Sequence, residues 1–154
     1  MRNFRMTLVA LLVMATPALA SLANDPGVKI LHDYVLTMPK VMAYDTAYRA
    51  FNAAAKKDAG LATEAEQTSD EHAPTVADTI NKMVKHPKIY AFFQKQGLSQ
   101  TEAALLPLIL VNACTVVMYK ADPAQLKDMV SQSQIDFCKA NLAKLKTTIM
   151  LSGH

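Results

Sequence analysis

The stretch that decides the fold is residues 99–119, SQTEAALLPLILVNACTVVMY. Ser99 and Glu102 have the spacing of a capping box, in which each side chain accepts a hydrogen bond from the other residue's backbone N–H at the start of a helix. No charged residue follows Glu102 before Lys120. Because a helix without a polar face belongs inside a bundle or against lipid, this stretch predicts a central apolar helix over about 99–119.

Membrane contact is the alternative interpretation of this helix, and the sequence favours the bundle interior. A membrane-spanning helix needs about 20 apolar residues, and the uncharged part, Ala103 to Tyr119, is shorter. It also contains Pro107, Asn112 and Thr115, which leave polar groups that are costly in lipid. We therefore expect neighbouring helices to surround it.

Amphipathic helices are predicted on both sides of the apolar stretch. Over 38–57, apolar residues repeat every three or four positions, at Val41, Tyr44, Tyr48, Phe51 and Ala55. Near the end of the chain the same period recurs at Ile135, Cys138, Leu142, Leu145 and Ile149. This period is typical of helices that bury one face.

Prolines and capping residues predict shorter helices near 26–33, from Thr75, from Pro87 to Gly97 and from Asp122. No strand-like alternation of any length appears. The predicted fold class is therefore all-α, a compact bundle of five to seven helices around the central apolar helix at about 99–119.

Residues 58–74, DAGLATEAEQTSDEHAP, interrupt the helical period. They carry five acidic residues and no lysine or arginine. The prediction is a solvated acidic loop with room for one helical turn. A calcium-binding loop is the alternative, but it requires alternating acidic ligands and a glycine at the bend, and this pattern is absent.

The first twenty residues, MRNFRMTLVALLVMATPALA, have the features of a Sec-type signal peptide. Arg2 and Arg5 precede an apolar segment, and Ala18 and Ala20 provide small residues at the expected cleavage site. A transmembrane anchor is the alternative, for which the apolar segment is too short. We expect cleavage after Ala20, a single helical domain over 21–154 and a periplasmic or secreted location.

The composition indicates a globular chain. Apolar residues make up 51% and charged residues 19%, which excludes a disordered chain or a coiled-coil rod. Cleavage would remove two of the 16 basic residues, which leaves 14 basic against 13 acidic residues and a net charge of +1. We predict no nucleic-acid partner, because nucleic-acid binders are usually strongly basic.

Cys114 and Cys138 are the two cysteines of the chain. An even count in an exported protein favours a disulfide, and antiparallel helices would bring the two sulfurs to similar heights. Two buried thiols are the alternative. The chain has no Cys-x-x-Cys pair, which disfavours a redox role and excludes covalent c-type haem.

A search for catalytic patterns favours a protein that is not an enzyme. The chain has no nucleophile elbow, phosphate-binding loop or dinucleotide fingerprint. An active site assembled from distant residues would escape such a search, so enzymatic activity stays open.

No cofactor is predicted, and two metal-containing groups remain as alternatives. His32, Met38 and Met42 are weak candidates for a copper site, because thioethers suit Cu(I). Methionine is, however, mainly a filler of core gaps. An apolar helical bundle could also hold haem without a covalent link, through a His, Tyr or Met ligand.

Four lysines form a candidate basic surface: Lys82, Lys85, Lys88 and Lys95. They alternate with aromatic and aliphatic residues, so they could contact anionic lipid or the acidic face of a partner. The ordinary interpretation is a solvated face over a packed core.

Three stretches resemble an uncharacterised group of small exported bacterial proteins. They are LTMPKVMAYDTAYRAF at 36–51, HPKIYAFFQKQGLS at 86–99 and SQSQIDFCKANLAKL at 131–145. The two cysteines and the long 58–74 segment depart from that group's pattern. The resemblance implies an exported helical domain and no particular activity.

These observations favour an exported helical module that binds a protein partner or a small apolar ligand. The candidate site is an apolar groove beside the 99–119 helix, although the same residues would equally suit a plain core: Tyr44, Tyr48, Phe51, Phe93, Leu106, Leu110 and Val117. One alternative is a carrier of haem or copper. Another is a membrane-associated accessory subunit of an envelope complex, which would use the 82–95 lysines and the 103–119 helix.

Overall fold

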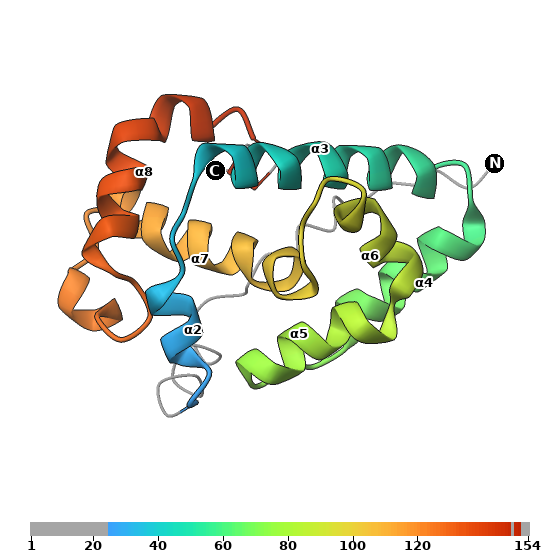
Figure 1. Cartoon of the computed structure of the whole chain (residues 1–154), viewed down its shortest axis with the longest axis horizontal. Coiled ribbons are helices and arrows are strands. Elements are labelled where there is room, and N and C mark those ends of the chain that lie inside the picture. The colour runs from blue at the N-terminus through green and yellow to red at the C-terminus, as the bar shows by residue number, and fades with distance from the viewer. Residues whose placement is uncertain (1–24, 149, 152–154) are drawn as a thin grey trace.

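The structure, a computed structural model, describes residues 25–148, 150 and 151, so the expected signal peptide at 1–20 lies outside the described residues. The described part is all-helical, without strands, which confirms the predicted fold class (Figure 1). Its elements are α2 (Val28–Asp33), α3 (Met38–Ala55), α4 (Ala59–Asp70), α5 (Val76–Lys85), α6 (Pro87–Gln94), α7 (Gln100–Tyr119), a short 3-10 helix η1 (Pro123–Leu126) and α8 (Gln132–Leu145).

Helix α7 is the central element, as the sequence predicts. The capping box forms at its start: the Ser99 hydroxyl accepts from the Glu102 N–H at 3.2 Å, and the Ser99 N–H donates to Glu102 Oε2 at 2.8 Å. Every residue from Ala103 to Leu110 is buried, including Pro107 inside the helix. Helix α7 packs against α8, α5, α6, α2 and α3, so its neighbours surround it (Figure 1).

By length and composition, α7 is also long and apolar enough to cross a membrane. In its most apolar window, however, 61% of the residues are buried inside the protein. The core of a soluble bundle shows this pattern, and it supports the bundle-interior interpretation of the sequence.

The predicted disulfide is present and joins α7 to α8. The Cα atoms of Cys114 and Cys138 are 5.4 Å apart, within the usual range for a disulfide, and both residues are fully buried. The bond fastens the central helix to the C-terminal one.

The prediction of an acidic loop over 58–74 is wrong, because most of this range is helix α4. The Asp58 carboxylate caps the helix by accepting from the N–H groups of Gly60 at 2.9 Å and Leu61 at 3.1 Å. The buried positions of α4 are Leu61 and Thr68, with Ala65 partly buried against the core. Such a small and partly polar inner face lacks the large apolar period by which a helix is recognised.

Candidate functional site

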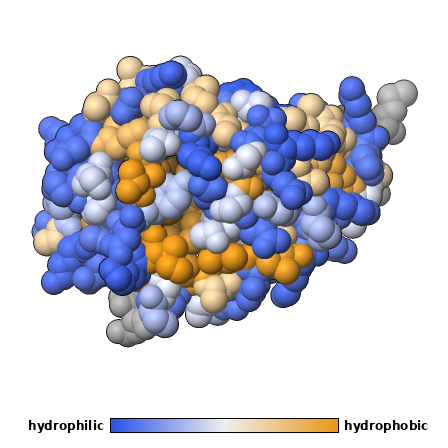
Figure 2. All heavy atoms as spheres, viewed as in Figure 1, coloured by the Kyte–Doolittle hydropathy of each residue, from blue (hydrophilic) through white to orange (hydrophobic). Residues whose placement is uncertain are grey.

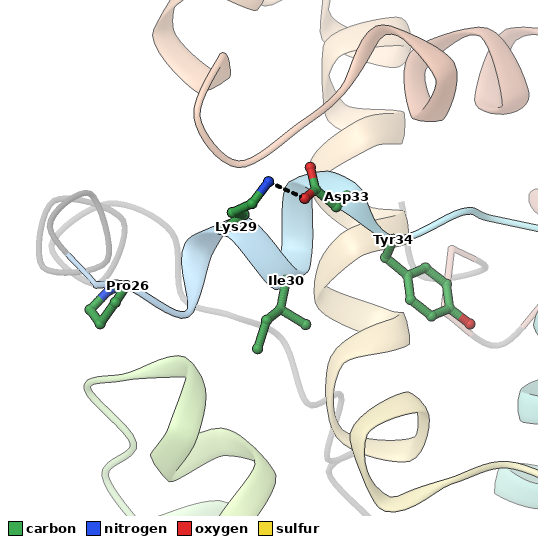
Figure 3. A pocket seen from close by; sticks show the side chains of 5 residues that line it. All are labelled: Pro26, Lys29, Ile30, Asp33 and Tyr34. Atoms are coloured by element: carbon green, nitrogen blue, oxygen red, sulfur yellow. Dashed lines mark hydrogen bonds and ion pairs between the residues drawn. The ribbon is translucent and has the colours of Figure 1, made fainter.

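A shallow hollow of about 450 Å³, widely open to solvent, lies along the short helix α2. Its lining residues all come from α2 and the positions that flank it: Pro26, Lys29, Ile30, Asp33 and Tyr34. In Figure 3, Pro26, Ile30 and Tyr34 point to one side of the helix, while Lys29 and Asp33 lie on the other. Lys29 and Asp33 form an ion pair, so the hollow has an apolar wall and a charged rim.

The start of α2 is fixed against the start of α5. The Asp25 carboxylate accepts a hydrogen bond from the Gly27 N–H at 2.8 Å and another from the Val76 N–H. A Cβ atom on Gly27 would lie 2.7 Å from the Val76 Cβ, a distance that side chains do not tolerate. Glycine at position 27 therefore permits the close approach of the two elements.

The end of α2 is fixed by a side chain from the other end of the chain. Gln134, on α8, is almost fully buried, and its Nε2 donates to the carbonyl oxygens of Leu31 at 2.7 Å and Tyr34 at 2.8 Å. These carbonyls lie where the helix ends and have no partner within the helix. The amide of Gln134 thus holds the last turn of α2 in place.

Tyr34 connects the hollow to the start of α7. Its hydroxyl donates to Glu102 Oε1 at 3.3 Å, and the ammonium of Lys40 lies 3.0 Å from the same oxygen. Partial burial and the nearby Glu102 raise the pKa of Tyr34 to about 12, so the hydroxyl stays protonated at neutral pH. For Glu102, partial burial acts to raise the pKa, but the Ser99 N–H and Lys40 outweigh it and hold the pKa below its usual value.

Two aliphatic side chains at α2 face solvent. Ile30 is 46% exposed and Val35, just beyond the helix, is 71% exposed. Figure 2 shows hydrophobic atoms gathered over the region where α2 and α5 lie in Figure 1. We use the name α2 surface for the hollow together with Val35.

The residues predicted to line an apolar groove pack against one another and against the core in the structure. The candidate residues on α3 and α6 form a row of rings, with centroids 6.1 Å apart for Tyr44 and Tyr48, 6.1 Å for Tyr48 and Phe51, and 5.0 Å for Tyr44 and Phe93. Phe92 extends the row, 5.8 Å from Phe51. We call these five residues the aromatic row.

The remaining groove candidates are also core residues. Leu106 and Leu110 are fully buried, and Val117 packs partly buried against the same cluster. The apolar period of a helix indicates which face is covered, but it does not distinguish a filled core from an open groove. Sequence reasoning therefore missed the α2 surface, whose single signal was a short helix with apolar residues on its exposed side.

The weak copper candidates lie on two different helices. His32 lies on α2 with its Nδ1 2.9 Å from Asp33 Oδ1. Met38 and Met42 lie on α3, where Met38 packs against the core and Met42 is exposed. In the described part of the chain, no three His, Cys, Asp or Glu side chains are arranged to hold a metal ion.

The predicted basic surface is divided between different roles. Lys82 is partly buried, and its Nζ donates to the carbonyl oxygens of Thr68, at 3.2 Å, and Glu71. Burial lowers the pKa of Lys82, and the neighbouring Glu71 opposes this shift. Lys95 lies over the Phe92 ring, 5.8 Å from its centroid. The other two candidates, Lys85 and Lys88, are exposed.

His86 occupies a buried position beside α4 that the sequence did not indicate. Its Nδ1 is 3.6 Å from Glu64 Oε1, and its Nε2 is 3.4 Å from Glu71 Oε1. It precedes Pro87 at the start of α6, but its side chain makes no cap hydrogen bond there. Together, Lys82 and His86 tie α4 to the corner between α5 and α6, and we call these two residues the α4 clamp.

No protein-family model, curated protein or solved structure matches this chain. Any functional conclusion therefore depends on the geometry of the molecule itself.

Proposed function

We propose that this protein is an exported helical binding module that recognises an apolar segment of a protein partner through the α2 surface. The observation that carries the proposal is the exposure of Ile30 and Val35 around a hollow with a charged rim. Protein interfaces commonly place apolar anchors at the centre and polar residues at the edge.

The fixed position of α2 supports this role. A six-residue helix is too short to be stable alone, yet Asp25 holds its start and Gln134 holds its end. A surface that is ordered before binding loses less conformational entropy when the partner arrives. The bonds at both ends of α2 therefore favour recognition by a rigid surface.

Export is supported by three features that agree. The first twenty residues have the pattern of a signal peptide, and the disulfide between Cys114 and Cys138 suits an oxidising compartment. The resemblance to small exported helical proteins of bacteria points to the same location.

Site-specific crosslinking in cells tests the partner. A photoreactive amino acid at Val35 is expected to give a discrete adduct with another protein after irradiation, and Ile30→Glu in the same chain is expected to abolish it. The same photoreactive group at Lys144, an exposed residue of α8, is the matched control. Equal adducts from Val35 and Lys144, or an adduct that survives Ile30→Glu, would contradict the proposal.

Cell fractionation tests the location. The mature protein is expected in the soluble periplasmic or secreted fraction, without residues 1–20 by mass spectrometry. Recovery in the membrane fraction after a high-salt wash would instead favour the accessory-subunit alternative.

A further inference from the structure

One face of α8 carries two contacts with other helices. Gln134 and Cys138 are four positions apart on α8, so they lie one above the other on the same face. The Gln134 amide donates to carbonyl oxygens at the end of α2, and the Cys138 sulfur is bonded to Cys114 on α7. The disulfide therefore lies one helical turn from the side chain that holds the last turn of α2.

The last turn of α2 depends on the position of α8. The Nε2 atom of Gln134 donates to the carbonyl oxygens of Leu31, Tyr34 and also His32, the last at 3.3 Å. If the start of α8 moves away, these oxygens lose this donor. A helix of six residues has too few internal hydrogen bonds to stay ordered by itself, so we expect α2 to open when this happens.

The disulfide restrains this movement of α8. Between α7 and α8, residues 120–128 are mostly exposed, and they include the short helix η1. An exposed connection of this kind restrains the next helix weakly. Packing of α8 against α7, with Ile135 and Cys138 buried, provides the non-covalent attachment. The bond to Cys114 adds a covalent link, so α8 cannot separate from α7 at Cys138 while the bond is intact.

We propose that formation of the disulfide between Cys114 and Cys138 is the step that orders the α2 surface, so that the protein becomes competent to bind its partner only in an oxidising compartment. This inference rests on the function proposed above. Each thiol gives up one proton and one electron as the S–S bond forms, and a disulfide oxidant takes up both electrons and both protons and becomes a dithiol. In the reducing cytosol, packing alone holds α8, and the last turn of α2 opens readily.

Limited proteolysis with trypsin tests the effect on α2. Lys29 has an exposed side chain within α2, and cleavage after it requires local opening of the helix. Oxidised wild-type protein is compared with the same chain refolded and kept in dithiothreitol. Cleavage after Lys29 is expected to be at least about tenfold faster in the reduced protein, because the last turn loses its buried donor. Cleavage after Lys85, an exposed residue at the end of α5, is the internal control and is expected to stay unchanged.

Two variants separate the route through Gln134 from a general loss of stability. Cys114→Ala with Cys138→Ala is expected to reproduce the faster cleavage of the reduced protein, which provides the same comparison if the double variant does not fold. Gln134→Leu with the disulfide intact is expected to speed the same cleavage. Adding Gln134→Leu to the cysteine double variant is expected to give much less than the product of the two effects, because both changes release the same contact.

Two results of the proteolysis would overturn the proposal. Equal cleavage after Lys29 in the oxidised and reduced proteins would show that the bond does not order α2. An equal increase after Lys29 and Lys85 would show that reduction destabilises the whole bundle instead.

Photocrosslinking from Val35 distinguishes this inference from the proposed function. Loss of the Val35 adduct in the cysteine double variant would support the inference. An adduct that persists in this variant would overturn the inference and leave the binding function standing. Absence of the adduct in the oxidised wild-type protein would contradict the binding function, while cleavage after Lys29 still tests the effect of the disulfide without a partner.

Discussion

Loss of the disulfide is predicted to destabilise the protein by an amount that the structure allows us to calculate. Cys114 and Cys138 are separated by 24 residues, so the bond closes a loop of about 25 residues in the unfolded chain. The loop-entropy relation gives about 3.5 kcal/mol of stabilisation for this length. Because a domain of this size is stable by only about 5–15 kcal/mol, the bond supplies a large part of the total.

The perturbation is the double variant Cys114→Ala with Cys138→Ala, compared with wild-type protein reduced by dithiothreitol. Both cysteines are fully buried, so the alanines also leave a small void that costs about 1 kcal/mol more. We expect the free energy of unfolding to fall by about 3.5 kcal/mol on reduction and by about 4.5 kcal/mol in the double variant.

Urea unfolding followed by circular dichroism measures both changes. At a urea dependence of about 2 kcal/mol/M, the midpoint is expected to fall by about 1.7 M on reduction and by about 2.2 M in the double variant. Thr115→Ala with Lys139→Ala changes the neighbouring residues and is the matched control, expected within about 0.5 kcal/mol of wild type. If reduction and the double variant both change the free energy of unfolding by less than about 1 kcal/mol, the loop argument fails for this protein.

Three further predictions concern the surroundings of α2. Gly27→Ala is expected to lower the free energy of unfolding by about 1–3 kcal/mol, because the new Cβ would overlap Val76; thermal unfolding measures it. Gln134→Leu leaves the carbonyls of Leu31 and Tyr34 without their donor and is expected to cost about 2–4 kcal/mol, with faster proteolytic cleavage near α2 as a second readout. The raised pKa of Tyr34, about 12 against 10.0 for the free side chain, means that the unfolded chain loses this proton first, so stability is expected to fall as pH rises from about 10 to about 12; alkaline titration of Tyr34→Phe, in which this part of the loss is absent, checks it.

The parts of the fold that depend on local sequence could be predicted. Ser99 and Glu102 indicated the start of the central helix, because a capping box involves residues three positions apart. The pairing of Cys114 with Cys138 followed from an even cysteine count and antiparallel helices. The capping box depends on residues three positions apart, and the disulfide was indicated by the number of cysteines, so both signals are present in the sequence itself.

The parts that depend on long-range contacts could not be predicted. In the structure, Gln134 accepts a hydrogen bond from the Ser131 N–H at the start of α8. Nothing near it in the sequence indicates its further bonds to carbonyls about 100 positions away. Helix α4 was missed because its inner face, with Leu61 and Thr68, is too small and polar to produce a clear period. The aromatic side chains of α3 and α6 fitted both a groove and a core, and only their mutual packing decides between these alternatives.

The hydrogen bonds that hold the end of α2 come from Gln134 on α8, so α2 can reach its final position only after α8 has been made. A growing chain that stops before residue 134 contains every residue of the hollow but lacks the amide that holds its last turn. Chains are made from the N-terminus, so α2 is synthesised long before α8, the helix whose Gln134 stabilises its last turn. A truncation that ends before Gln134 would therefore weaken a surface from which it removes no residue.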